Sequence, residues 1–115
     1  VRLDINQAIP CALMINEMIS NSFKHAFNNM EEGKIRVSFK ELDDRITLKV
    51  QDNGVGLPED FDLASSGSLG MTLINTLARQ LDADLQYQGD YWKGFVATFE
   101  KIQLSELEEP YHFNG

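Results

Sequence analysis

Near the N-terminus, apolar residues recur at the spacing of one face of a helix. This pattern runs from about Ala8 to Asn28 and predicts a helix, with Pro10 near its start. At about 100° per residue, its apolar residues fall in one narrow stripe, which comprises Ile15, Ile19, Ser22 and Ala26 and is flanked by Cys11, Ala12 and Phe23. We expect this stripe to face the core.

Strict alternation of apolar and polar residues then predicts two strands, about 35–40 and 46–51. Leu42-Asp43-Asp44 is polar enough to turn between them, so the pair reads as an antiparallel hairpin. A long glycine-containing loop from Asp52 to Gly70 follows, and loops of this length tend to be functional or mobile.

Leucines at 73, 77 and 81 predict a second helix from about Met71 to Leu81. Two last strands follow, about Asp84–Gln88 and Gly94–Ile102. Because helices and strands are mixed and hairpins dominate, the predicted fold class is α+β. We expect a two-layer α/β sandwich with a mixed, mostly antiparallel sheet and the helices on one face.

Length and charge narrow the classes of function. The 115 residues fit one domain, 1–104, with an acidic tail, 105–115. The net charge of −8 argues against a general nucleic-acid binder, and the short apolar runs predict no transmembrane helix and no direct membrane contact. The single cysteine, Cys11, excludes an internal disulfide and reads as a buried thiol. Since the chain does not begin with Met, we expect a piece of a longer protein.

One face of the first helix carries candidate chemistry. Glu17, Asn21, Lys24 and Asn28 lie within about 60° of one another, almost opposite the apolar stripe. A carboxylate, an amide and an ammonium in this order suit a metal ion with a phosphate, since hard cations prefer oxygen ligands. A solvated helix face with a Glu–Lys pair is the alternative.

Asp52 continues the parity of the apolar residues on the second strand, so its carboxylate should lie on the apolar face. A carboxylate there needs a hydrogen-bond partner, and the amino group of a base would be one. Alternatively, Asp52 starts a turn through Asn53 and Gly54. Gly54 and Gly56 would let a flat ligand approach the main chain, or would simply turn it.

The small-residue segment 65–70 precedes the second helix and offers a helix N-terminus to phosphate, although a flexible linker fits equally. His25 lies beside Lys24 and could contact phosphate. It has no second histidine nearby, so it makes a poor zinc ligand. His112 lies in the tail and is interpreted as a bystander.

Three segments together resemble the motifs of the GHKL ATPase/kinase superfamily. Residues 17–26 resemble its N box, 52–56 its first glycine box and 68–71 its second, in the family order. The resemblance runs from about Ile9 to Phe99, and the nearest likeness is the ATP-binding catalytic domain of sensor histidine kinases. It implies a Bergerat-type sandwich that binds ATP and Mg²⁺.

The resemblance also implies roles for individual residues. Asn21 would hold Mg²⁺, Lys24 and His25 would contact phosphate oxygens, and Glu17 is the candidate general base. The end of the site that binds adenine would be formed by Asp52, whose carboxylate accepts a hydrogen bond from the adenine amino group, and by Gly54 and Gly56. The segment 59–70 would be the ATP lid, and its end would meet the phosphates through Ser68, Leu69, Gly70 and Met71.

Two positions depart from the family pattern. Ser68 stands where a glycine is common, which would narrow the conformations of the lid. The last strand carries Gly94-Phe95 where many relatives have Gly-Thr, so a polar contact near the adenine would be lost or replaced by water.

The implied reaction transfers the γ-phosphoryl group of ATP to a histidine on a separate helical dimerisation domain, which in turn serves a response regulator. We therefore expect a cytoplasmic domain, of a soluble or membrane-anchored parent, that binds ATP but does not phosphorylate itself. Two alternatives stay open: a serine kinase of the anti-sigma type, and a non-catalytic module that senses nucleotide or binds protein.

Overall fold

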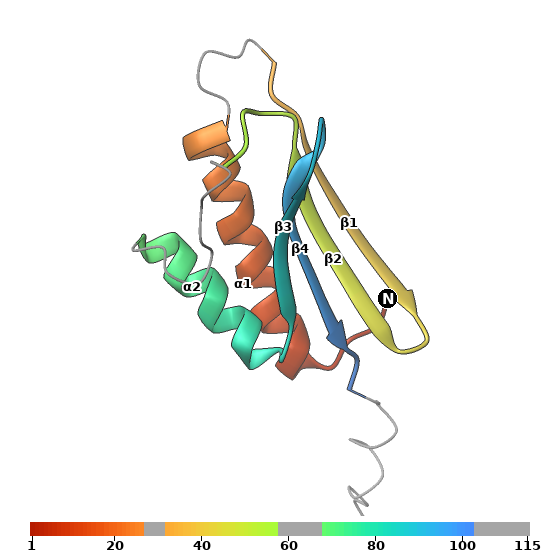
Figure 1. Ribbon diagram of the computed structural model, residues 1–115. Coiled ribbons are helices and arrows are strands. Elements are labelled where there is room, and N and C mark those ends of the chain that lie inside the picture. The colour runs from red at the N-terminus through yellow and green to blue at the C-terminus, as the bar shows by residue number, and fades with distance from the viewer. Residues whose placement is uncertain (27–31, 58–67, 103–115) are drawn as a thin grey trace, which may run out of the picture.

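The computed structural model describes residues 1–26, 32–57 and 68–102 (Figure 1). Its elements, in chain order, are α1 (Ile5–Asn21), the π-helical turn η1 (Ser22–Ala26), β1 (Ile35–Leu42), β2 (Arg45–Asp52), α2 (Leu69–Gln80), β3 (Asp84–Gly89) and β4 (Lys93–Glu100). The predicted tail 105–115, with His112, and most of the predicted lid lie outside the described residues.

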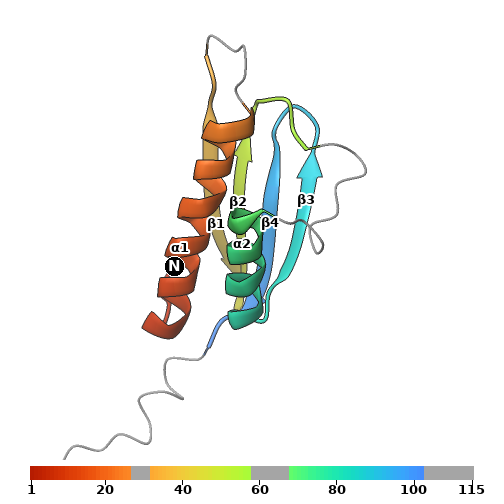
Figure 2. The ribbon, with the colours of Figure 1, turned by 90° about the vertical axis from the view of Figure 1, so that its left-hand side faces the viewer.

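Four strands form one sheet in the order β1-β2-β4-β3, and each of the three pairings is antiparallel. Both helices cover the same face of this sheet (Figures 1 and 2). The predicted α+β class and two-layer architecture are confirmed. The described strands contain no parallel pairing, so the sheet there is wholly antiparallel rather than mixed. None of the described helices is long and apolar enough to cross a membrane.

Helix α1 begins three residues earlier than predicted because Asp4 caps it. The Asn6 backbone N–H donates to Asp4 Oδ1 at 2.8 Å, which satisfies one of the free donors of the first turn. Pro10 consequently lies inside the helix rather than near its start. The predicted end of the helix, Asn28, lies outside the described residues.

The predicted apolar stripe of α1 is only partly correct. Cys11 and Ser22 are buried as expected, and Ile15 and Ile19 pack against the core, but the most deeply buried row is a neighbouring one. Met14 and Met18 are 0% and 1% exposed, whereas Ile15 and Ile19 are only half-buried. Phe23, placed beside the stripe in the prediction, is 71% exposed. Both rows of α1 are apolar at helical spacing, so periodicity alone does not distinguish them. Packing against α2 and β2 selects the row of methionines.

The predicted hairpin is confirmed and has a two-residue turn. Leu42 pairs with Arg45, and the two turn residues, Asp43 and Asp44, have φ values of 51° and 63°. Positive φ at both positions is characteristic of a type I′ turn, whose twist matches that of the flanking strands. This turn sets the register that brings Ile35 opposite Asp52.

Helix α2 begins at Leu69, two residues before the predicted start, because Ser68 caps it. The Met71 N–H donates to Ser68 Oγ at 3.1 Å. Of the predicted leucine stripe, Leu77 and Leu81 are buried, but Leu73 is exposed. The core between α1, α2 and the sheet consists of buried apolar side chains: Cys11, Met14, Met18, Ile46, Leu48, Val50, Met71, Ile74, Leu77, Ala78, Leu81, Phe95, Ala97 and Phe99.

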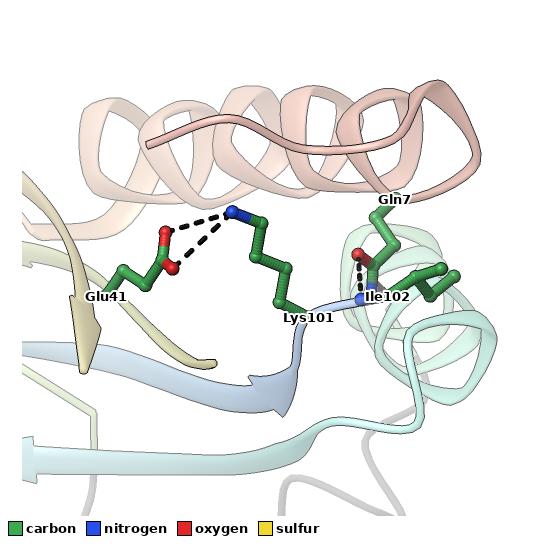
Figure 3. Close-up of polar contacts among 4 residues, drawn as sticks. All are labelled: Gln7, Glu41, Lys101 and Ile102. Carbon is green, nitrogen blue, oxygen red and sulfur yellow. Dashed lines mark hydrogen bonds and ion pairs between the residues drawn. The ribbon is translucent and has the colours of Figure 1, made fainter. Parts of the chain in front are cut away.

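The end of β4 is attached to the start of α1, at the opposite end of the sandwich from the loop that follows β2 (Figures 1 and 3). Gln7 Nε2 donates to the Glu100 carbonyl at 2.8 Å, and the Ile102 N–H donates to Gln7 Oε1 at 2.9 Å. Lys101 Nζ forms an ion pair with Glu41 at 3.2 Å. These contacts fix one end of the two layers against each other and leave the other end for the candidate site.

Candidate functional site

Three segments supply the candidate residues: the last turns of α1 with η1, the end of β2 with residues 53–57, and the first turn of α2. They are distant in sequence, but a hydrogen bond from Ser22 to Asp52 and the approach of Asn21 to Gly70 join them. Figure 2 shows the two helices side by side over the sheet, with the C-terminal end of α1 beside the end of β2.

Asp52 lies on the helix-covered face of β2, as its parity predicted, and is 5% exposed. Its Oδ2 accepts a hydrogen bond from Ser22 Oγ at 2.8 Å, and its Oδ1 accepts one from the Gly54 N–H at 2.8 Å. The second contact shows that Asp52 also starts the turn through Asn53 and Gly54, so the covered position and the turn occur together. A carboxylate has about four acceptor positions, so two bonds leave capacity for a donor from a ligand.

The loop after β2 is fastened to strands β3 and β4. Lys93 Nζ donates to the Gly54 carbonyl, and the Leu57 N–H donates to the Tyr87 hydroxyl oxygen at 3.1 Å. Between them, Gly56 has a φ of 77°, a conformation that favours glycine, as expected. Gly54 is different: its φ is not positive, and it is buried with both its N–H and its carbonyl bound.

Burial and the nearby Asp52 carboxylate raise the pKa of Tyr87, although the hydrogen bond from Leu57 opposes the rise; burial is the largest cause. The phenol therefore stays protonated at neutral pH. Its ring packs edge-on against Phe95, with centroids 5.3 Å apart. Phe95, at a position where the family pattern carries a polar residue, is thus a core residue that supports the Tyr87 ring.

Glu17 and Asn21 converge on the first turn of α2. A Cβ built on Gly70 would lie 3.3 Å from Asn21 Oδ1 and 3.4 Å from Glu17 Oε2. Both side chains are half-buried. Because Met14 and Met18 form the core-facing row, Glu17 and Asn21 flank that row instead of lying opposite it, as the sequence had suggested.

The helix N-terminus at Gly70 has one of its donors already bound. The Met71 N–H is used by the Ser68 cap, and the Met71 side chain is buried in the core. Leu69 is 84% exposed. The remaining candidates lie on η1: Lys24 is exposed there, and the side chain of His25 lies outside what the structure describes.

Three residues of the site were not identified from the sequence: Ser22, Tyr87 and Lys93. Ser22 was assigned only to the core stripe, although a hydroxyl in an apolar stripe requires a partner. Tyr87 and Lys93 lie on strands far along the chain, and only the cross-strand register brings Lys93 opposite Asp52. The one local signal in the sequence was that Tyr87 has the inward-facing parity of its strand and lies beside a glycine-containing loop.

Known proteins resemble this chain over most of its length. Residues 6–106 match the family described as histidine kinase-, DNA gyrase B-, and HSP90-like ATPase. The blue-light-activated histidine kinase 2 of Erythrobacter litoralis is 28% identical over 105 residues, which cover 90% of this chain and 29% of that protein. The sensor histidine kinase PdtaS of Mycobacterium tuberculosis is 33% identical over 85 residues, covering 72% of this chain and 17% of that protein.

Another relative has a different activity in its name. The serine-protein kinase RsbW of Listeria innocua is 33% identical over 79 residues, covering 56% of this chain and 50% of that protein. This chain therefore spans half or less of the length of these three relatives.

Solved structures share the fold. The blue-light activated histidine kinase of Erythrobacter litoralis superposes with a TM-score of 0.79 at 24% identity, covering 88% of this chain and 32% of that one. The catalytic domain of the histidine kinase ThkA gives 0.65 at 14% identity, covering 81% and 67%.

Proposed function

The chain belongs to the histidine kinase-, DNA gyrase B- and HSP90-like ATPase family, and we propose that it is the ATP-binding catalytic domain of a sensor histidine kinase. The observation that carries the proposal is the joint placement of Asp52 and of the Glu17–Asn21 pair. Ser22, which holds Asp52, follows Asn21 directly, and Asn21 faces Gly70 at the start of α2. A base site and a phosphate site are thereby adjacent along α1.

At the base end, Asp52 accepts from the exocyclic amino group of adenine. Its buried carboxylate stays in one orientation because Ser22 and the Gly54 N–H hold its two oxygens. Guanine would present a carbonyl oxygen where adenine has the amino group. Two acceptors would then face each other in a buried site, which is costly. The arrangement therefore favours adenine nucleotides.

At the phosphate end, the side chains present fit a magnesium ion. Asn21 Oδ1 and Glu17 Oε2 are hard oxygen donors that reach the same point above Gly70. In this proposal Asn21 holds the ion, and Lys24 and His25 contact phosphate oxygens. When bound, Mg²⁺ neutralises negative charge on the phosphates. The first turn of α2, where Leu69 is exposed and Gly70 is half-buried, adds free N–H donors and a favourable helix dipole.

The reaction proposed is transfer of the γ-phosphoryl group to a histidine nitrogen on a separate helical domain of the parent protein. Such transfer depends mainly on positioning and charge neutralisation. Glu17 is half-buried beside Asn21 and is the candidate base that accepts a proton from the attacking group. The phosphohistidine would then supply a response regulator. Since ATP is its substrate, this domain would work in the cytoplasm.

A second candidate is a serine kinase of the anti-sigma type, favoured by the 33% identity to RsbW. It needs the same ATP site, so the two candidates differ only in the acceptor. Phosphohistidine is hydrolysed by acid, whereas phosphoserine survives it. The stability of the transferred phosphate in acid therefore separates them.

The first experiment is calorimetry of Mg²⁺-ATP binding to the wild type and to Asp52→Asn. Asn keeps the shape but loses the charge and one acceptor oxygen, so binding should weaken at least about tenfold, or ~1.4 kcal/mol. Asp90→Asn, at an exposed position, is the matched control and should bind like the wild type. If the wild type binds no ATP, with or without Mg²⁺, the non-catalytic module becomes the favoured interpretation.

The second experiment supplies an acceptor. The chain is incubated with labelled ATP and with the helical histidine domain of a sensor kinase. We expect acid-labile phosphate on that domain and none on the chain itself. Acid-stable phosphate on a supplied anti-anti-sigma protein would instead identify the serine kinase.

A further inference from the structure

We propose that Lys93 and Tyr87 are positioning residues that hold the loop Gly54–Leu57 in the shape that receives the adenine base. This inference rests on the proposed function and assigns roles to two residues outside the three motifs.

Lys93 holds the start of the loop. It is the register partner of Asp52, but its ammonium group does not form an ion pair with that carboxylate among the described contacts. Lys93 Nζ instead donates to the Gly54 carbonyl and, at 3.2 Å, to the Tyr91 carbonyl. Hydrogen bonds from a charged donor are stronger than neutral ones. The Gly54 backbone is consequently held on both sides, by Asp52 through its N–H and by Lys93 through its carbonyl.

Tyr87 holds the end of the loop. Its hydroxyl oxygen accepts from the Leu57 N–H at 3.1 Å, and the Phe95 ring packed against it restricts its rotation. The loop between these two anchors is short and includes Gly56 at a φ of 77°. Without the anchors, such a glycine-containing segment would sample many conformations, and binding would have to order it.

The side chains also form a surface under Gly56. A Cβ built on Gly56 would lie 2.5 Å from Lys93 Cδ and 3.4 Å from the Tyr87 hydroxyl oxygen. The stem of Lys93 and the tip of Tyr87 thus support the glycine from the side of β3 and β4. Since the loop directly follows Asp52, its position sets the space beside the carboxylate that receives the base.

The test compares Lys93→Met and Tyr87→Phe with the wild type. Met keeps the apolar stem but removes the ammonium, and Phe removes only the hydroxyl. Each should weaken Mg²⁺-ATP binding about tenfold, since each removes one hydrogen bond that orders the loop. Lys40→Met is the matched control, because Lys40 is exposed on the outer face of β1 and should bind ATP like the wild type.

Adenosine distinguishes the base end from the phosphate end. If Lys93 and Tyr87 act through the loop, affinity for adenosine falls by the same factor as affinity for ATP. A loss for ATP with unchanged adenosine binding would make Lys93 a phosphate ligand and would overturn the positioning role. Unchanged binding of both ligands to both variants would overturn it as well.

Amide hydrogen exchange provides a readout that needs no nucleotide. Tyr87→Phe should speed exchange of the Leu57 amide several-fold while amides in the centre of β2 stay protected. Equal Leu57 exchange in variant and wild type would contradict the Tyr87 anchor. Failure of the wild type to bind ATP or adenosine would refute the proposed function, whereas wild-type binding with unaffected variants refutes this inference alone.

Discussion

Replacing Gly70 by alanine should separate the stability of the fold from its function. Gly70 is the second residue of α2, and its φ is not positive, so the backbone accepts an alanine. The nearest atoms to the new methyl group would be Asn21 Oδ1 at 3.3 Å and Glu17 Oε2 at 3.4 Å. These contacts are tight, but both atoms end side chains that can shift by a few tenths of an ångström.

The effect on stability follows from helix propensity. Alanine is favoured over glycine inside a helix by about 0.8–1.0 kcal/mol, and crowding against Asn21 and Glu17 offsets part of this gain. The free energy of unfolding should therefore rise by between zero and about 1 kcal/mol. With a urea dependence of about 1–3 kcal/mol per molar, the midpoint should rise by up to about 1 M.

The effect of the substitution on ligand affinity has the opposite sign. In the proposed site, the methyl group would occupy the space between the two oxygens and the helix N-terminus, where the phosphates would bind. Mg²⁺-ATP binding should weaken at least about tenfold, or ~1.4 kcal/mol. The Asn21 and Glu17 side chains could restore the space only by leaving the positions that the proposed function requires, Asn21 as the magnesium ligand and Glu17 as the base.

Urea unfolding and calorimetry on the same preparations test both halves. Gln80→Ala, at an exposed position near the end of α2, is the control for helix propensity and should leave binding unchanged. A Gly70→Ala protein that is as stable as the wild type and binds Mg²⁺-ATP equally well would refute the assignment of Glu17, Asn21 and Gly70 to a phosphate site.

Two predictions concern the fold. Gly94→Ala should destabilise it by about 1–3 kcal/mol or more, because a Cβ there would lie 2.0 Å from the Val50 carbonyl oxygen and would force β2 and β4 apart. An unchanged melting temperature would contradict this packing. Burial raises the pKa of the Cys11 thiol from 9.0 to about 11. The unfolded chain thus loses this proton first, and the free energy of unfolding should fall as pH rises from 9 to 11, by about 1.4 kcal/mol per unit. Cys11→Ala should lack this part of the slope, and parallel pH profiles of the two proteins would refute the assignment.

Several features of the fold follow from local sequence alone. The alternation through β1 and β2 and the two aspartates between them predicted the hairpin, and the structure confirms it. The same alternation placed Asp52 on the covered face. These predictions succeed because strand parity and turn conformation depend on a few neighbouring residues.

The orientation of α1 could not be predicted in this way. Two adjacent rows of the helix are apolar, and the spacing favoured Ile15 and Ile19 where the structure buries Met14 and Met18. The rotation matters for the proposed function, because it brings Glu17 and Asn21 beside the core instead of opposite it. The identity of the buried row and the geometry of the site therefore both depend on how α1 packs against α2 and the sheet.

Local sequence is sufficient to give the order of the three motifs, the period of each element and the face on which Asp52 lies. Tertiary packing, in contrast, is what brings Asn21 against Gly70 and places Lys93 and Tyr87 against the loop after β2. The period of an element is a property of its own backbone. Which of its faces is buried, and which distant residues meet there, depends on the free energy of packing against elements far away in the chain.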